Sequence, residues 1–208
     1  MKGSFNYYGF HKAALPLNGT PIWAGFVQAV PLGGTFASDY VRDGVLYPAG
    51  TPVSLSDGTI TPLIFVKVTA VDTDGGTITV DTGEYGVIPE TSDYLRAVAD
   101  SFDSVDAAGT AISAVSYESK NSYTLTTDLA SSVAEGDYLI LTPDSDSIAT
   151  PTGYLRNDAY VTPNGDSAAL SGGVVSHCGE GIMIDRTPAA AVATAMAAAV
   201  PNVIQVNG

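Results

Sequence analysis

The chain has 208 residues, with 22 acidic against 8 basic side chains and a formal charge of −14. This acidity excludes a nucleic-acid binder, which needs clustered Lys and Arg for phosphates, and disfavours attachment to an anionic membrane surface. Hydrophobic residues make up 45%, enough for a real core in a chain of this length, so global disorder is excluded as well. Cys178 is the one cysteine, which excludes an internal disulfide and a cysteine-rich metal cluster.

Residues 1–40 combine many Gly and Pro residues with many aromatic residues. Breakers at this density leave no room for a long helix or a central strand, whereas aromatic side chains favour burial against a surface. We therefore predict an extended arm that packs either on the chain's own body or, as we slightly prefer, on a partner chain. The predicted docking residues are Phe5, Tyr7, Tyr8, Phe10, Trp23, Phe26 and Phe36.

From about residue 41 to 161, short runs rich in β-branched residues alternate with turn signals. The runs favour strands over helices, and Gly, Pro and Asp mark the turns between them. Turn sequences of this kind include Pro48-Ala49-Gly50, Ser56-Asp57-Gly58 and residues 72–76. The predicted strands are residues 45–47, 51–55, 63–71, 77–81 and 138–142.

One pattern occurs twice in this region. Residues 68–71 match residues 112–115 at an offset of 44, and residues 77–80 match residues 124–127 at an offset of 47. The two units therefore read as hairpins of one pattern, with turns that differ by three residues. Two copies do not make a solenoid, which needs at least three. They indicate a small antiparallel barrel or sandwich built from hairpins.

The C-terminal part returns to loops around residues 150–173 and then gives strand candidates at 174–175 and 181–185. Thr187 and Pro188 suit an N-cap and the first position of a helix over residues 189–199. This helix has no charged face, so we expect another surface to cover it. Its apolar run is too short to span a bilayer, which needs about 20 residues. Residues 203–206 are a predicted terminal strand.

These expectations give a mostly β protein in three parts. Residues 1–40 form the arm for docking, residues 41–187 the β body, and residues 188–208 the Ala-rich helix and terminal strand. No secretory signal is visible at the start of the sequence.

Catalytic and metal signatures are weak. His177-Cys178-Gly179-Glu180 combines three reactive side chains, but adjacent strand residues point to opposite faces, so we interpret the run as a turn with an inert cysteine. Asp72-x-Asp74-Gly75 and Asp144-x-Asp146 resemble half of a calcium loop, yet the glutamate required at the twelfth position is absent after Asp72. We predict no catalytic residue, no metal site and no cofactor. Most of the eleven Tyr residues are interpreted as packing, with carbohydrate contact as the alternative.

Several sequence motifs resemble motifs of phage capsid decoration and head-fibre proteins, including those of crAss-like gut phages. They are the strand-turn-strand Gly44 to Val53, the run Thr124 to Leu141 with its Gly136-Asp137 turn, and the segment Gly173 to Arg186. The resemblance covers about residues 41–187. It implies a non-enzymatic structural protein that is made in the host cytoplasm and carried on the outer surface of the virion. It also implies a homotrimer whose N-terminal arm docks on the major capsid protein or another capsid protein. The aromatic arm and the Ala-rich helix have no counterpart in the small decoration proteins, and burial of the helix near the threefold axis is our own hypothesis.

Two other functions stay open. The chain could be a particle-displayed module that binds surface glycans or a receptor, or an enzyme whose carboxylate pair meets only in three dimensions. The charge distribution favours the structural role. Residues 1–40 hold two Lys, one His and one acid, Asp39, whereas the rest of the chain holds 21 acidic against 6 basic side chains. An acidic body joined to a near-neutral aromatic foot suits a protein attached to a particle.

Overall fold

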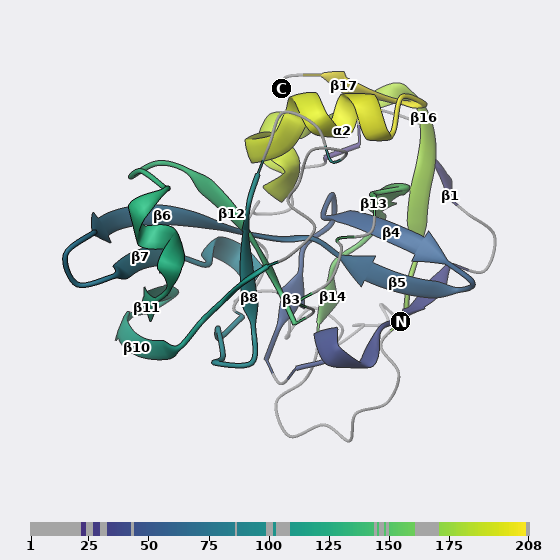
Figure 1. The fold of residues 1–208 in the computed structure, drawn as a ribbon. Coiled ribbons are helices and arrows are strands. Elements are labelled where there is room, and N and C mark those ends of the chain that lie inside the picture. Colours follow the sequence, from purple (N-terminus) through teal and green to yellow (C-terminus); the bar gives the residue numbers. More distant parts are fainter. Residues whose placement is uncertain are drawn as a thin grey trace, which may run out of the picture.

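The computed structural model describes residues 22–23, 27–29, 33–42, 44–85, 87–98, 109–143, 150–160 and 171–206, together with positions 102, 145 and 148. It is mostly β, with two curled sheets that form half-barrels, which confirms the predicted fold class (Figure 1). Within the described ranges the one α-helix is α2 (Ala193–Ala199). No helix in those ranges has the length and apolar character of a bilayer-spanning segment.

The larger sheet joins strands from the N-terminal, middle and C-terminal parts of the chain. Its order is β1-β16-β13-β4-β5-β2-β15, and β17 adds to β16 in parallel. The long strand β16 pairs with β1 along one edge, and with β13 and then β17 along the other. The bounds are β1 (Val27–Ala29), β2 (Gly34–Phe36), β4 (Pro52–Ser56), β5 (Thr59–Pro62), β13 (Gly153–Leu155), β15 (Ser171–Gly172), β16 (Val174–Met183) and β17 (Val203–Val206).

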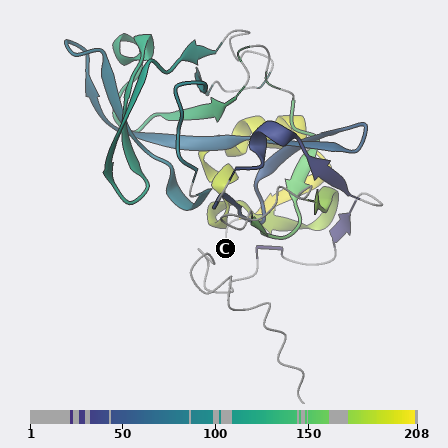
Figure 2. The same cartoon turned by 90° about the horizontal axis from the view of Figure 1, so that it is seen from below.

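The second sheet has the order β10-β11-β7-β6-β12-β8-β9 and is antiparallel throughout. Only Leu63 separates β5 from β6, so the chain passes directly from one sheet into the other (Figure 2). The bounds are β6 (Ile64–Asp72), β7 (Thr77–Asp81), β8 (Tyr94–Ala97), β9 (Thr110–Ala111), β10 (Ala114–Ser119), β11 (Ser122–Thr126) and β12 (Tyr138–Thr142).

Short elements complete the fold. A two-stranded ribbon pairs β3 (Leu46–Tyr47) with β14 (Ala159–Tyr160). The 3-10 helices are η1 (Ser38–Tyr40), η2 (Gly83–Tyr85), η4 (Asp128–Ser131), η5 (Ile184–Arg186) and η6 (Pro188–Val192).

The repeated sequence pattern corresponds to two hairpins that lie side by side in the second sheet. Val71 pairs with Ile78 in hairpin β6–β7, and Val115 pairs with Leu125 in hairpin β10–β11. These pairs reproduce the offsets of 44 and 47, and the three extra residues lengthen the second hairpin. The inner strands β7 and β11 also pair, with Ile78 directly opposite Leu125. The equivalent residues therefore mark a local twofold axis, and the predicted pair of hairpins is confirmed.

The turn between β4 and β5 shows why its residue types are needed. Asp57 and Gly58 have φ angles of 49° and 78°, the left-handed conformation that a two-residue hairpin turn of the primed type requires. Asp tolerates this conformation and Gly adopts it without steric cost. The strand predicted at 51–55 and the turn predicted at 56–58 are confirmed, whereas β5 was not among the predicted strands.

Several strands are buried on both faces, which explains why they read as nearly continuous apolar runs. Leu139 and Leu141 of β12 enter a first core cluster that takes side chains from both sheets, whereas Ile140 enters a second. In the same way, Tyr154 of β13 enters the second cluster and Leu155 the first. The second cluster is closed by the C-terminal segment.

The Ala-rich segment departs from its prediction in two ways. It is not one helix, because 3-10 helix η6 precedes α2, and Thr187 gives no side-chain cap. Its hydroxyl instead donates to the carbonyl oxygen of Ile184 at 2.9 Å. The cover that the uncharged segment needs comes from its own chain, since Val192 and Met196 are buried in the second cluster. The segment's burial on one face therefore requires no threefold axis.

The region before this segment was predicted correctly only in part. The two strand candidates at 174–175 and 181–185 are parts of one strand, β16, and residues 184–186 form η5. His177-Cys178-Gly179-Glu180 lies inside β16 and is a strand, not a turn. The backbone of Cys178 has Val27 of β1 as its partner on one side and Val203 of β17 on the other. Because β16 pairs with strands that are far away in the sequence, its backbone is extended despite the local turn signal of Gly179. The terminal strand predicted at 203–206 is confirmed as β17.

Candidate functional site

The aromatic residues predicted for docking have two different outcomes. Phe36 is 4% exposed and stacks on Tyr47 at a centroid distance of 5.0 Å, so it belongs to the first core cluster. Trp23 is half-buried and donates from Nε1 to the carbonyl oxygen of Arg156 at 3.1 Å. Both therefore pack on this chain's own body, the alternative that the sequence left open. The other predicted docking residues, Phe5, Tyr7, Tyr8, Phe10 and Phe26, lie outside the described residues.

The Pro48-Ala49-Gly50-Thr51 segment after β3 has a structural role. Gly50 has a φ angle of 82°, and the hydroxyl of Thr51 donates to the carbonyl oxygen of Pro48 at 2.6 Å. The amide of Ala49 donates to a carboxylate oxygen of Asp158 at 2.7 Å. These bonds account for the Pro-Ala-Gly-Thr turn as a fixed connection between β3 and β4.

One of the aspartates considered as calcium ligands, Asp72, has a structural role in a turn. Asp72 accepts a hydrogen bond from the amide of Gly75 at 3.0 Å, which fixes the β6–β7 turn. Asp144 and Asp146 lie outside the described residues. Within the parts of the chain that the structure describes, no three His, Cys, Asp or Glu side chains gather as a metal site would need.

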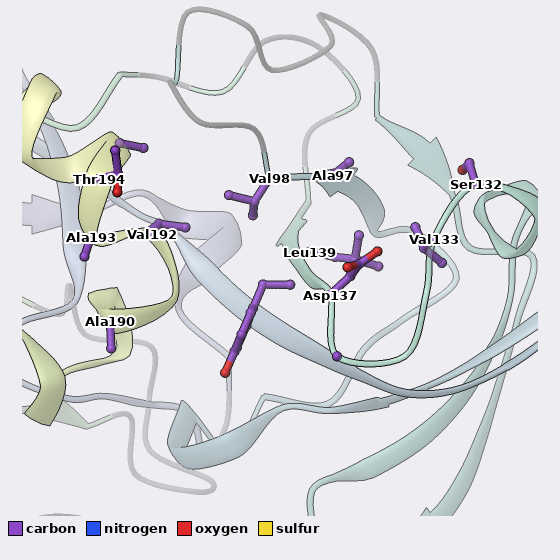
Figure 3. A pocket seen from close by; sticks show the side chains of 13 residues that line it. Ala97, Val98, Ser132, Val133, Asp137, Leu139, Ala190, Val192, Ala193 and Thr194 are labelled. Carbon is purple, nitrogen blue, oxygen red and sulfur yellow. The ribbon is translucent and has the colours of Figure 1, made fainter.

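The candidate site is a groove of about 430 Å³ between the second sheet and the C-terminal segment. This volume falls within the range of small-molecule sites, about 300–1,000 Å³. One wall is made by η6 and the start of α2, and the other by the loop before β12, with the end of β8 between them (Figure 3). The lining residues are Ala97, Val98, Ser132, Val133, Gly136–Leu139, Ala190 and Val192–Ala195.

Tyr138 occupies a position set by strand alternation. It lies two residues before Ile140 and so shares the face of β12 that the C-terminal segment covers. The C-terminal segment covers Ile140 completely but leaves Tyr138 37% exposed. An aromatic side chain that lines a groove in this way offers both an apolar ring surface and a hydroxyl.

Asp137 is the one charged residue in the lining. One of its carboxylate oxygens accepts the amide of Ala134 at 2.8 Å, which closes the loop before β12. Val68 of β6 exchanges two backbone hydrogen bonds with this loop, one with Gly136 and one with Asp137, both at 2.8 Å. The carboxylate is therefore held at the wall by a turn fixed on the neighbouring strand.

The opposite wall is held by the terminal strand. The side-chain amide of Gln205 donates to the carbonyl oxygen of Ala193 at 2.9 Å and to the hydroxyl of Tyr154 at 3.2 Å. Burial raises the pKa of Tyr154 to about 12, against the opposing effect of the Gln205 hydrogen bond. Its hydroxyl is therefore protonated at neutral pH and accepts the hydrogen bond from Gln205. Both walls of the groove are thus anchored to the cores.

A second exposed aromatic site lies on hairpin β10–β11. Tyr117 is 68% exposed and packs edge-on against Tyr123, with ring centroids 5.9 Å apart. On the opposite face of the same sheet, Thr79 and Thr124 share a hydrogen bond of 3.1 Å between their side chains. Tyr117 is not among the residues that line the groove, so the two sites are separate.

The sequence did not reveal the groove. Its walls come from residues about 55 positions apart, and the Gly136-Asp137-Tyr138 phrase was interpreted only as a turn entering a strand. The one available signal was an aromatic residue directly after Gly-Asp, at the position where the buried alternation of β12 begins. Comparison of the chain with protein-family models, with curated proteins and with solved structures gives no match.

Proposed function

We propose that this protein is a non-enzymatic structural protein on the outer surface of a phage particle, a head fibre or decoration protein. The observation that carries the proposal is the division of the chain into an acidic β body and a near-neutral aromatic N-terminal segment. The strand-turn-strand phrases that resemble decoration proteins point in the same direction. In this proposal the body faces outward, and its net negative charge keeps it soluble and apart from its neighbours.

The structure of the body favours a docking segment that is shorter than residues 1–40. Strand β1 and strand β2 are built into the larger sheet, and Ile22 is 5% exposed. We therefore assign docking on the major capsid protein, or another capsid protein, to the aromatic residues before Ile22. They are Phe5, Tyr7, Tyr8 and Phe10. Aromatic anchors of this kind dominate the energetics of many interfaces.

The proposal is tested on particles. An antibody raised against the purified chain is used to probe density-gradient fractions of phage particles from the culture in which the sequence occurs. The protein should band with intact particles, and its recovery only in particle-free fractions would overturn the proposal. Native mass spectrometry of the purified chain tests the homotrimer, which a monomer at micromolar concentration would contradict.

The docking segment is tested by replacing Phe5, Tyr7, Tyr8 and Phe10 with Ser. This variant should lose its place on the particles while its thermal unfolding stays unchanged. The matched control is Tyr117→Ser, which removes an exposed aromatic ring from the body and should leave attachment intact. Equal attachment of both variants would remove the N-terminal segment from the proposal.

A second candidate function is a particle-displayed module that binds surface glycans. The groove favours it, because an aromatic residue, Tyr138, and a carboxylate, that of Asp137, both line it. This function is compatible with attachment to a particle and is tested separately below.

A further inference from the structure

We infer that the groove between β12 and the C-terminal segment binds an uncharged saccharide unit, with the ring of Tyr138 against one face of the sugar. The inference rests on the second candidate function and gives it a site. The sugar's hydroxyl groups would be hydrogen-bonded by Asp137 and by the hydroxyls of Ser132 and Thr194, which line the same groove.

The charge of the lining restricts the ligand. Asp137 is the one charged side chain, and no Lys, Arg or His is present among the residues that line the groove. A phosphate, sulfate or uronic acid would meet a carboxylate without a compensating cation, which is unfavourable in a half-enclosed site. Acidic glycans and nucleotides are therefore excluded, and a neutral ligand is favoured.

The chemistry of the lining matches a polyol. A carboxylate accepts hydrogen bonds, and the Tyr138 and Thr194 hydroxyls both donate and accept them. A sugar needs this mixture because each of its hydroxyl groups is a donor and an acceptor. The hydroxyl of Ser132 donates to the carbonyl oxygen of Leu129 at 3.1 Å, which leaves its lone pairs as acceptors.

The apolar part of the lining consists mostly of short side chains. Ala97, Ala190 and Ala193 have short side chains, and Val98 is half-buried. The larger apolar lining residues Leu139 and Val192 are themselves buried, so a ligand would meet mainly Ala and Val side chains. Such a surface suits the C–H face of a sugar ring, which is flat and apolar, when the exposed ring of Tyr138 lies beside it. These features favour a saccharide over an aliphatic peptide as the occupant.

Both walls are held before any ligand arrives. The Ala134–Asp137 turn is fixed on Val68, and the start of α2 is fixed by Gln205 through the carbonyl oxygen of Ala193. A preformed site loses little conformational entropy on binding, which matters for a sugar because its individual hydrogen bonds replace bonds to water.

The test uses the full-length chain on an array of neutral oligosaccharides built from glucose, galactose, mannose and N-acetylhexosamines, with acidic glycans included. Binders are then titrated in solution by calorimetry. We expect binding to one or more neutral glycans and none that requires an acidic group. Tyr138→Ala should weaken binding by about tenfold or more, since it removes the stacking surface.

Two further variants test the geometry. Asp137→Asn keeps an oxygen that can accept the Ala134 amide but removes the charge, and it should weaken binding. Thr194→Trp, at an exposed position of the wall, should fill the groove and abolish binding. Thermal unfolding of each variant establishes that it is folded, and Thr194→Val serves as the milder variant if Thr194→Trp unfolds.

Tyr117→Ala is the matched control and should bind as the unaltered chain does. Glycan binding that depends on Tyr117 and not on Tyr138 would overturn the groove and leave the glycan-binding function intact. Absence of binding to every neutral glycan at millimolar concentration would overturn both the groove and the second candidate function. Binding of an apolar peptide that Thr194→Trp blocks, without any glycan binding, would assign the groove to a protein partner instead. Attachment to particles is measured independently and is unaffected by these outcomes.

Discussion

Arg42 forms a bidentate ion pair with Asp93, and this pair ties the N-terminal part of the chain to the second sheet. Nη1 of Arg42 lies 2.8 Å from Oδ2 of Asp93, and Nη2 donates to Oδ1. The side chain of Asp93 is fully buried, and Oδ2 also accepts the amide of Glu90 at 2.9 Å. The hydrogen bonds to Asp93 raise the pKa of Arg42 above its usual value, so the guanidinium group stays charged.

Removing one member of this pair should be costly. Arg42→Ala leaves the buried carboxylate of Asp93 without its cation, and we expect a loss of about 3 kcal/mol in the free energy of unfolding. Chemical denaturation measures it. The double variant Arg42→Met with Asp93→Leu should recover much of the loss, because apolar pairs often replace buried ion pairs without penalty. A single variant as stable as the unaltered chain would contradict a structural role for the pair.

Stability should fall at high pH because of Tyr154. Burial raises its pKa to about 12, above the ordinary value of about 10 that it has in the unfolded chain. The contribution of Tyr154 to the free energy of unfolding is therefore complete below about pH 10. As the pH rises from about 10 to about 12, this contribution is lost, and the free energy of unfolding falls by about 2–3 kcal/mol.

The measurement is the free energy of unfolding of the unaltered chain and of Tyr154→Phe across this pH window. The difference between the two should shift in favour of Tyr154→Phe as the pH rises. Tyr117→Phe, at an exposed position, should follow the unaltered chain. Parallel curves for all three proteins would contradict the burial effect on Tyr154.

The hairpins could be predicted from the sequence because their signals are local. Alternation, β-branched residues and Gly-containing turns define them, and even the correspondence of Ile78 with Leu125 follows from the repeated pattern. Strands β1 and β2 could not be predicted, because each is three residues long and exists through pairing with distant strands. The groove was missed for the same reason. Its two walls, at Asp137 and Ala193, meet only after the C-terminal segment covers the second face of β12.

The local twofold axis predicts energetic coupling between its two central residues. Ile78 and Leu125 are both fully buried and lie opposite each other across β7 and β11. Leu125→Ala should lower the free energy of unfolding by about 2–5 kcal/mol and Ile78→Val by about 1 kcal/mol. The double variant should deviate from additivity by about 0.5 kcal/mol or more, because the two side chains share one packing site.

The control for this coupling combines Leu125→Ala with Met196→Ala, which lies in the other core cluster. Those two losses should add. A cycle in which both pairs are additive would show that Ile78 and Leu125 do not pack on each other.

The C-terminal helix should respond differently on its two faces. Met196 is fully buried in the second cluster, whereas Ala197 is exposed. Met196→Ala should cost about 3 kcal/mol through the cavity that it leaves, while Ala197→Glu should change the free energy of unfolding by less than about 0.5 kcal/mol. Thermal unfolding measures both. A large effect of Ala197→Glu that depends on protein concentration would show that a second copy covers the outer face of α2.

Gly153 should not tolerate a side chain, although its backbone is ordinary. A Cβ at this position would lie 2.6 Å from the carbonyl oxygen of Val175 and 2.8 Å from Cγ1 of Val174. Strand β13 cannot move away, because β4 and β16 hold it on its two sides. Gly153→Ala should therefore cost about 2–3 kcal/mol. Gly173→Ala is the matched control, since its Cβ would meet only the side chain of Arg156 at 3.5 Å, and it should stay within about 0.5 kcal/mol of the unaltered chain. Equal stability of the two variants in urea denaturation would mean that β13 is not clamped between its neighbours, and the tight packing of the larger sheet around Tyr154 would then be contradicted.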